Sequence, residues 1–233
     1  INKIDLVKLK SIIKGIIKGC KISNCELDGG ETAEMPGTYE KGKFDIAGFA
    51  VGVVDQKKIL NKSKIKKNNL ILAVPSSGLH SNGFSLVRHL IQKNKINIKK
   101  NKFLKNELIK PTKIYVNEIL DLIKKDLLIG CANITGGGLA DNIKRVIPEN
   151  LCAEINLNKI KPLKIFKWLS NKGIKDNEML KTFNCGVGFC LIINPKNLVK
   201  VTKLFSNQFK PYIIGKISNH SQKVKLNGNI NWL

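Results

Sequence analysis

The sequence is poor in arginine, in aromatic residues and in long apolar runs, and each shortage excludes a class of protein. Only Arg88 and Arg145 among the 41 basic residues are arginines, and aromatic residues make up 6% of the chain. Base recognition depends on the arginine fork and single-strand binding on aromatic stacking, so we expect no nucleic-acid partner despite a net charge of +24. No apolar run reaches the roughly 18 residues that cross a bilayer, so we expect no membrane partner.

Metal and nucleotide motifs of the common kinds are also missing. The six cysteines form no C-x-x-C pair and no histidine stands at zinc-finger spacing, which favours free thiols in a reducing, cytoplasmic setting. The chain contains neither a G-x-x-x-x-G-K-[ST] loop nor the H-R-D set of protein kinases. These absences exclude a zinc finger, a P-loop nucleotidase and a protein kinase.

What is present suits an α/β or α+β protein. The 233 residues are 42% hydrophobic, and this length suffices for one large domain or for one complete domain and part of another. A lysine- and asparagine-rich connector at 57–69 divides the chain, and helical spacing predicts a core-packing amphipathic helix over 4–23. Further strands are predicted at 44–55, 70–74, 129–134, 186–194 and 211–217, and helices over 83–93, 112–125, 139–146, 162–172, 176–181 and 195–207. Alternating strands and helices indicate a layered α/β fold.

The densest motif is Gly-Gly-Glu-Thr-Ala-Glu at 29–34, which precedes an apolar segment that carries Asp45. Glycine lets the backbone turn sharply and approach a ligand closely. Glu31 and Glu34 beside that turn offer the oxygen ligands that Mg²⁺ prefers, usually together with phosphates. The alternative is an ordinary Gly-Gly turn with acidic side chains on the surface. Three motifs further along the chain favour the metal-binding interpretation.

The segment 75–88 reads Pro-Ser-Ser-Gly-Leu-His-Ser-Asn-Gly-Phe-Ser-Leu-Val-Arg and joins a predicted strand to a predicted helix. Such a loop presents hydroxyls, backbone N–H groups and a helix N-terminus at one place, which suits a phosphate group. His80 lies inside this cluster, so we expect it to transfer a proton or contact phosphate. The alternative is a structural or merely exposed histidine.

Two more glycine-rich turns follow. Thr-Gly-Gly-Gly at 135–138 again joins a strand to a helix, with Asn142 and Arg145 on the first turns of that helix. Thr182 and Asn184 precede a glycine-flanked strand, where an ordinary helix-to-strand connection is an equally good interpretation. Two or three anion cradles, a pair of carboxylates and one histidine together suit phosphoryl transfer from an ATP-type donor.

In this order, these blocks resemble the aminoimidazole ribonucleotide synthetases, also called phosphoribosylformylglycinamidine cyclo-ligases, over essentially the whole chain. The matching runs are 29–37, 47–52, 75–88, 134–145, 165–169 and 182–188. The resemblance implies that residues 1–56 end an N-terminal ATP-binding α/β domain, that 57–69 is a connector, and that 70–233 is a complete C-terminal α/β domain with a mixed sheet.

The resemblance also implies an activity and a site. Members of the family are carbon–nitrogen ligases of purine biosynthesis, which close the imidazole ring of formylglycinamidine ribonucleotide with ATP and Mg²⁺. Glu31 is then implied as the metal ligand and His80 as the catalytic residue. The residues implied to bind ATP or the phosphoribosyl substrate are Thr32, Asp45, Ser76, Ser77, Ser81, Asn82, Thr135, Gly136, Gly137, Gly138, Asn142, Thr182 and Asn184.

The sequence departs from the family pattern in several places. The family's glycine-rich nucleotide loop and Asp-Gly-x-Gly-Thr-Lys motif are absent from this sequence. We therefore expect weak ATP binding by this chain alone. We expect a homodimer only where the N-terminal domain is complete. Asp28, Asp141 and Lys144 replace an aliphatic residue, a glutamate and a proline usual in the family. The alternatives are a non-catalytic remnant, a subunit that needs a separate N-terminal partner, or another ATP-using member of the superfamily, such as thiamine-monophosphate kinase.

Overall fold

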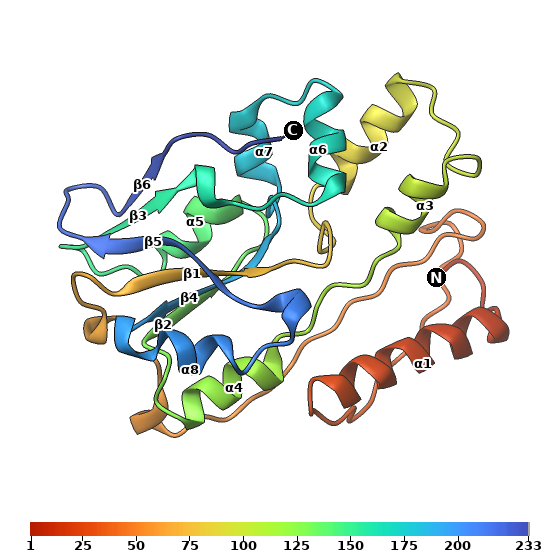
Figure 1. Cartoon of the computed structure of the whole chain (residues 1–233). Coiled ribbons are helices and arrows are strands. Elements are labelled where there is room, and N and C mark those ends of the chain that lie inside the picture. The colour runs from red at the N-terminus through yellow and green to blue at the C-terminus, as the bar shows by residue number, and fades with distance from the viewer. Residues whose placement is uncertain (233) are drawn as a thin grey trace. The chain divides into compact units, whose positions relative to one another are not determined.

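The computed structural model describes residues 1–232, which fall into two compact units. The first unit contains residues 1–59 and 114–117, and the second contains 60–113 and the chain from 118 onward. Figure 1 labels their helices and strands. No helix among residues 1–232 is long and apolar enough to cross a membrane. The domain limits drawn from the sequence stay a prediction.

The second unit is built on a six-stranded sheet with the strand order β2-β4-β1-β5-β3-β6 (Figure 1). Neighbouring strands are antiparallel except β3 and β6, which are parallel, so the mixed sheet expected from the sequence is confirmed. The strands are β1 (Leu70–Pro75), β2 (Gly130–Asn133), β3 (Cys152–Asn156), β4 (Val187–Ile193), β5 (Tyr212–Ser218) and β6 (Val224–Asn227).

The core of this unit lies on both faces of β1. Side chains from Ile71 to Val74 are 0% exposed. Because successive side chains of a strand point to opposite faces, Ile71 and Ala73 join the main core cluster, whereas Leu72 and Val74 are buried on the opposite face of the sheet. The helices are α2 (Phe84–Lys93), α3 (Lys102–Leu108), α4 (Val116–Lys124), α5 (Gly138–Lys144), α6 (Lys164–Asn171), α7 (Asp176–Thr182) and α8 (Leu198–Thr202).

The predicted strands at 70–74, 129–134, 186–194 and 211–217 are confirmed, as are the helices corresponding to α2, α5, α6 and α7. The sequence pattern does not predict β3, β6 or α3. The helix predicted over 112–125 begins only at Val116. The reason is that segment 111–113 pairs with another loop: the carbonyl of Pro111 accepts from Ser77 Oγ, and the N–H of Lys113 donates to His80 Nε2.

The helix predicted over 195–207 is shortened to α8, and Pro195 opens a separate 3₁₀ turn before it. Asn194 caps that turn, because its Oδ1 accepts from the N–H of Lys196 at 3.0 Å. Side-chain caps of this kind satisfy backbone donors that a continuous α-helix would use elsewhere. Local capping therefore divides what the sequence pattern presents as one helix.

The first unit is organised differently. Its only α-helix among residues 1–59, α1 (Leu6–Ile22), begins where Asp5 Oδ1 accepts from the N–H groups of Val7 and Lys8, both at 3.1 Å. The expectation that this helix packs into a core is wrong, because none of its residues is buried. The predicted strand at 44–55 is also wrong: residues 44–54 belong to no sheet and are all exposed. A strand needs a hydrogen-bonding neighbour, and residues 1–59 supply no other strand.

Candidate functional site

Three of the predicted motifs meet on the second unit: the loops 76–83, 135–138 and 182–186. The first and third are joined where Asn184 Nδ2 donates to the carbonyl of Gly78 at 2.9 Å. The second packs on the third, because a Cβ on Gly138 would lie 1.8 Å from the carbonyl oxygen of Leu180 and 3.3 Å from that of Phe183. The first and second approach at Asn82, whose Oδ1 lies 3.8 Å from where a Cβ on Gly136 would stand.

Asn184 fixes the junction between the end of β1 and the start of β4. Its Oδ1 accepts from Ser76 Oγ at 3.0 Å and from the N–H of Gly186 at 2.8 Å, while its Nδ2 donates to Gly78. The backbone donor Gly186 identifies the oxygen, so the amide orientation is unambiguous. Asn184 is 1% exposed and Ser76 is 3% exposed. Both predicted binding residues therefore hold the loops in place in this structure, and their polar groups are already paired.

His80 is almost completely buried, with 8% of its surface exposed. Its Nε2 accepts from the N–H of Ser77 at 2.9 Å and from the N–H of Lys113 at 3.4 Å. Because Nε2 accepts a backbone hydrogen, the ring proton of the neutral imidazole lies on Nδ1. Burial lowers the pKa of His80 to about 4, because the charged ring would lose hydration. At neutral pH this side chain is uncharged.

The backbone of this loop is held in unusual conformations. His80 and Ser81 have φ angles of +54° and +62°, a region that side chains other than glycine rarely adopt. Gly83 follows at +73°, and a Cβ there would lie 2.2 Å from the ring of Phe183, so only glycine fits. Such strain persists only where surrounding contacts enforce it, and here the contacts are those of Ser77 and Asn82 with His80.

Helix α2 starts directly after this loop and offers an anion-attracting end. Gly83 occupies the N-cap position and provides no side-chain hydrogen bond to the first turn. Arg88, one turn along, donates through Nη2 to Ser85 Oγ at 3.3 Å, and both residues are exposed. Uncapped N–H groups at a helix N-terminus and a nearby guanidinium together favour a phosphate group.

The triple-glycine turn is held together by Asn142, which is 3% exposed. Its Nδ2 donates to the carbonyls of Gly138 at 2.7 Å and Gly136 at 3.2 Å, and its Oδ1 accepts from Thr135 Oγ1 at 3.2 Å. The Asp141 carboxylate lies against Gly137, with Oδ2 3.1 Å from where a Cβ on Gly137 would stand. That negative charge opposes an anion at Gly137, so the end of α2 is the better phosphate site of the two.

Two further hydroxyls of the predicted site are engaged by the protein itself. Thr182 Oγ1 donates to Glu178 Oε1 at 2.5 Å, one turn back along α7. Ser77 Oγ donates to the carbonyl of Pro111 at 2.8 Å. Ser81, by contrast, is exposed, and Asn82 is half-buried with its Nδ2 on the carbonyl of His80. Ser81, Asn82 and the start of α2 therefore form the accessible part of the site.

Glu31, the predicted metal ligand, belongs to the first unit, as do Thr32 and Asp45, which are predicted to bind ATP or substrate. Every other predicted site residue belongs to the second unit. All three residues of the first unit are exposed, and Asp45 Oδ1 accepts from the N–H of Ile46 at 2.8 Å. Residues 1–232 contain no cluster of three or more potential metal ligands. The chain therefore has no preformed metal cage, but the exposed Glu31 carboxylate fits an Mg²⁺ ion that brings phosphate ligands with it.

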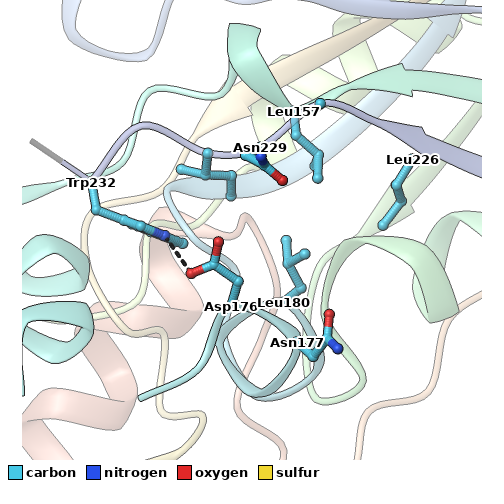
Figure 2. A pocket seen from close by; sticks show the side chains of 9 residues that line it. Leu157, Asp176, Asn177, Leu180, Leu226, Asn229 and Trp232 are labelled. Atoms are coloured by element: carbon cyan, nitrogen blue, oxygen red, sulfur yellow. Dashed lines mark hydrogen bonds between the residues drawn. The ribbon is translucent and has the colours of Figure 1, made fainter. Parts of the chain in front are cut away.

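Sequence reasoning missed a pocket of about 220 Å³ in the second unit (Figure 2). Figure 2 shows Asp176 of α7 beside Trp232, whose indole Nε1 donates to Asp176 Oδ1 at 2.9 Å. The lining residues are Leu157, Asp176, Asn177, Leu180, Leu226, Gly228, Asn229, Ile230 and Trp232. They come from three separate stretches of the chain, so no single sequence motif indicates the pocket.

Comparison with known families agrees with the motifs. The family model described as "AIR synthase related protein, C-terminal domain" matches residues 66–227. A phosphoribosylformylglycinamidine cyclo-ligase of Carboxydothermus hydrogenoformans is 42% identical, over 97% of this chain and 68% of its own length. For the chloroplastic or mitochondrial protein of Vigna unguiculata, also 42% identical, the match covers 93% of this chain but only 57% of that protein. The chain thus spans less than two thirds of some relatives.

Among solved structures, the thiamine monophosphate kinase of Aquifex aeolicus is similar over 98% of this chain and 70% of its own. The TM-score is 0.59 and the sequence identity is 14%. At that identity the likeness shows the fold alone. It confirms the mixed α/β fold that the sequence predicted.

Proposed function

This chain belongs to the family of AIR synthase-related proteins, whose cyclo-ligase members are its relatives, and from that membership we propose that it takes part in purine biosynthesis. The proposed reaction is the ring closure of formylglycinamidine ribonucleotide to aminoimidazole ribonucleotide, with ATP converted to ADP and phosphate. One observation of the structure carries this proposal: the loops 76–83, 135–138 and 182–186 meet beside the uncapped start of α2.

The proposed chemistry has two steps. The γ-phosphoryl group of ATP is transferred to the formamide oxygen, which turns that oxygen into a leaving group. An amidine nitrogen then attacks the same carbon, the C–O bond breaks, and phosphate departs as the imidazole ring closes. Catalysis of this kind depends mainly on positioning and on electrostatic stabilisation of phosphate oxygens. The backbone N–H groups at the uncapped start of α2 are suited to both tasks.

Within this site we assign the phosphate of the substrate to the start of α2, with Ser81, Asn82 and Arg88 around it. Ser81 and Arg88 are exposed, and Asn82 is half-buried. Ser76, Asn142 and Asn184 support these groups from beneath, because their polar atoms bond within the protein. Binding residues and supporting residues are thus distinct sets in this proposal.

The proposed role of His80 is proton transfer at the substrate, and the geometry sets a condition for it. Nε2 accepts from the backbone of Ser77 and Lys113, so it can take a proton only if these contacts open. With a pKa of about 4, the neutral ring is also a weak base while it stays buried. A catalytic His80 therefore requires substrate binding to rearrange loop 76–83.

ATP is the proposed co-substrate, and Mg²⁺ arrives with it to neutralise phosphate charge. Glu31 would supply one oxygen ligand to that ion, with Thr32 and Asp45 in the same unit. The carboxylate of Glu31 is exposed and makes no hydrogen bond or ion pair within residues 1–232, so it is available for this purpose. The homodimer and the cytoplasmic location expected from the sequence stay predictions.

The test is ADP release that depends on formylglycinamidine ribonucleotide. It compares this chain alone with the chain supplemented by the part of the Carboxydothermus hydrogenoformans relative that it does not match. We expect substrate-dependent release with the supplement, and little without it. ADP release that depends on thiamine monophosphate instead, or no release from a folded protein in either mixture, would contradict the proposal.

A further inference from the structure

The turn that ends helix α1 brings two cysteines together. Cys20 lies in the last turn of the helix, and Cys25 lies just beyond its end. Asn24 between them has a φ of +52°, the left-handed conformation that commonly stops a helix. The N–H of Cys25 donates to the carbonyl of Cys20 at 3.0 Å, and the N–H of Asn24 donates to that of Lys21 at 3.3 Å. These two bonds define a Schellman motif, in which the residue after the turn packs against the last helical turn.

The side chains of the two cysteines are in contact as well. Cys25 Sγ donates to the carbonyl of Cys20 at 3.7 Å and lies 3.4 Å from Ser23 Oγ. Partial burial, and then a side-chain hydrogen bond with the Cys25 thiol, raise the pKa of Cys20. Both cysteines are free thiols in this structure. A disulfide forms without backbone movement only where the two side chains point toward each other, and these contacts meet that condition.

The other four cysteines are protected from reagents in solution. Cys152, Cys185 and Cys190 are 0%, 4% and 0% exposed. Burial raises the pKa of Cys131 to about 11, so that thiol keeps its proton at neutral pH. Cys25, by contrast, is exposed. A small disulfide in solution therefore reacts first at Cys25.

A metal ion suits this pair of thiols less well than a disulfide. Structural zinc takes four protein ligands. Among residues 1–232, no group of three or more His, Cys, Asp and Glu side chains could hold a metal ion, so the two thiols have no further ligand beside them. The pair is therefore better suited to oxidation than to metal binding.

We propose that Cys20 and Cys25 form a reversible dithiol–disulfide pair that reacts with small disulfides of the glutathione type. The Cys25 thiolate attacks one sulfur of glutathione disulfide, which breaks the S–S bond and releases one glutathione. The Cys20 thiolate then attacks the Cys25 sulfur of the mixed disulfide and displaces the second glutathione. Two protein thiols are oxidised, one glutathione disulfide is reduced, and the two protons end on the two glutathione thiols.

The disulfide would close the turn that leads into the Gly-Gly-Glu motif at 29–34. No residue of α1 is buried, so no packed core holds its last turn. A covalent bond across the turn restricts local opening. The N–H groups of Ser23 and Cys25 bond back to the carbonyls of Gly19 and Cys20. We therefore expect amide exchange at Ser23 and Cys25 to slow by at least about threefold in the oxidised chain.

Peptide mapping of the full chain tests the proposal. The folded protein is incubated with excess glutathione disulfide, its remaining thiols are blocked with N-ethylmaleimide in denaturant, and it is cleaved after lysine. Because Lys21 lies between the two cysteines, peptides 19–21 and 22–41 stay joined only through the disulfide. We expect joined peptides from at least about half of the chains, and their separation by dithiothreitol. No joined peptides, or a glutathione adduct that persists on Cys25 while Cys20 stays free, would overturn the proposal.

Incubation in concentrated urea separates the effect of the turn from mere proximity in the sequence. Urea removes the turn and exposes all six cysteines to competing pairings. The share of chains with joined peptides should then fall by at least about threefold. An equal share in the folded and the unfolded protein would also overturn the proposal.

A substitution pair supplies the last control. Cys25→Ser should abolish the joined peptides. Cys131→Ser is the matched control and should leave their yield unchanged, because Cys131 lies on β2, outside the turn. A yield that fell equally in both variants would mean that another pairing is involved and would contradict the proposal. Circular dichroism confirms that both variants keep the sheet of the second unit.

Discussion

The two units carry motifs of similar clarity in the sequence but hold them in opposite ways. In the second unit, the loops at 76–83, 135–138 and 182–186 are fixed by buried amides and by glycines that leave no room for a side chain. In the first unit, no residue between 1 and 59 is buried, and Glu31 lies on an exposed loop. A recognisable motif therefore does not by itself imply a positioned site. Positioning comes from the packing beneath it.

The sharpest way to break this comparison is to substitute one glycine in each unit. Gly138→Ala introduces a Cβ 1.8 Å from the carbonyl oxygen of Leu180, at a residue whose φ is +66°. We expect the second unit to lose about 3–4 kcal/mol of unfolding free energy. Gly48→Ala, with nothing within 4 Å of the new Cβ, should change it by less than about 0.5 kcal/mol.

Urea unfolding followed by circular dichroism measures both glycine variants. Equal losses at Gly138 and Gly48 would show that the two units are held alike, against the comparison. An unchanged Gly138→Ala midpoint would show that the α7 turn can move away at little cost.

The next largest effect is expected at Asn184, whose buried side chain joins the loops 76–83 and 182–186. Asn184→Ala leaves Ser76 Oγ, the N–H of Gly186 and the carbonyl of Gly78 without their partner in a buried place. We expect a loss of about 2–3 kcal/mol in unfolding free energy, since buried polar groups are costly to leave unpaired. The control is Asp45→Ala in the first unit, where the carboxylate accepts only from the N–H of Ile46 and is exposed. If Asn184→Ala lost no more unfolding free energy than Asp45→Ala, the supporting role of Asn184 would be contradicted.

The same contrast explains how far the sequence could be interpreted. Strands and helices of the second unit were predictable where their buried apolar residues follow a regular pattern in the sequence, as in β1 and α2. The hydrogen bond between Ser76 and Asn184 was not predictable, because the two residues are 108 positions apart and nothing local indicates that they meet. Their residue types suggested ligand contacts, whereas the fold uses both groups internally.

The failures share a physical cause. Residues 44–54 have every local property of a strand, but a strand exists only with a neighbour. Segment 111–113 begins with a proline, a residue that favours helix starts, yet its backbone groups bond to Ser77 and His80. In both cases the outcome depends on partners far away in the sequence, which propensity and periodicity do not contain.

A smaller effect is expected from pH, and it sharpens the comparison because His80 belongs to the packed unit. Burial lowers its pKa in the folded protein to about 4, below the ordinary value of 6.5. Between these values the unfolded chain binds more protons than the folded one, so the unfolding free energy falls as pH decreases from 6.5 towards 4. The slope from this group is at most about 1.4 kcal/mol per pH unit.

The measurement is the urea midpoint at several pH values between 4 and 7.5. His80→Gln should reduce the slope in this window, and His89→Gln should not, because His89 is exposed on α2. An identical slope for His80→Gln and the unchanged chain would show that the histidine is not held neutral by burial.

The smallest effect concerns how each unit stabilises its helices. Helix α2 has no side-chain cap, but it buries Val87, Leu90 and Ile91. Helix α1 has a capping Asp5 and buries nothing. Tertiary packing should therefore stabilise α2, whereas α1 should depend on local terms such as its cap.

Asp5→Ala tests that division. We expect amide exchange in the first turns of α1 to speed up by about two- to fivefold, while the urea midpoint of the second unit stays unchanged. The reason is that the N–H groups of Val7 and Lys8 lose their acceptor and no buried side chain holds the turn in place. Unchanged exchange in α1 would mean that contacts beyond the cap stabilise this helix. The first unit would then be more self-sufficient than its exposed surface indicates.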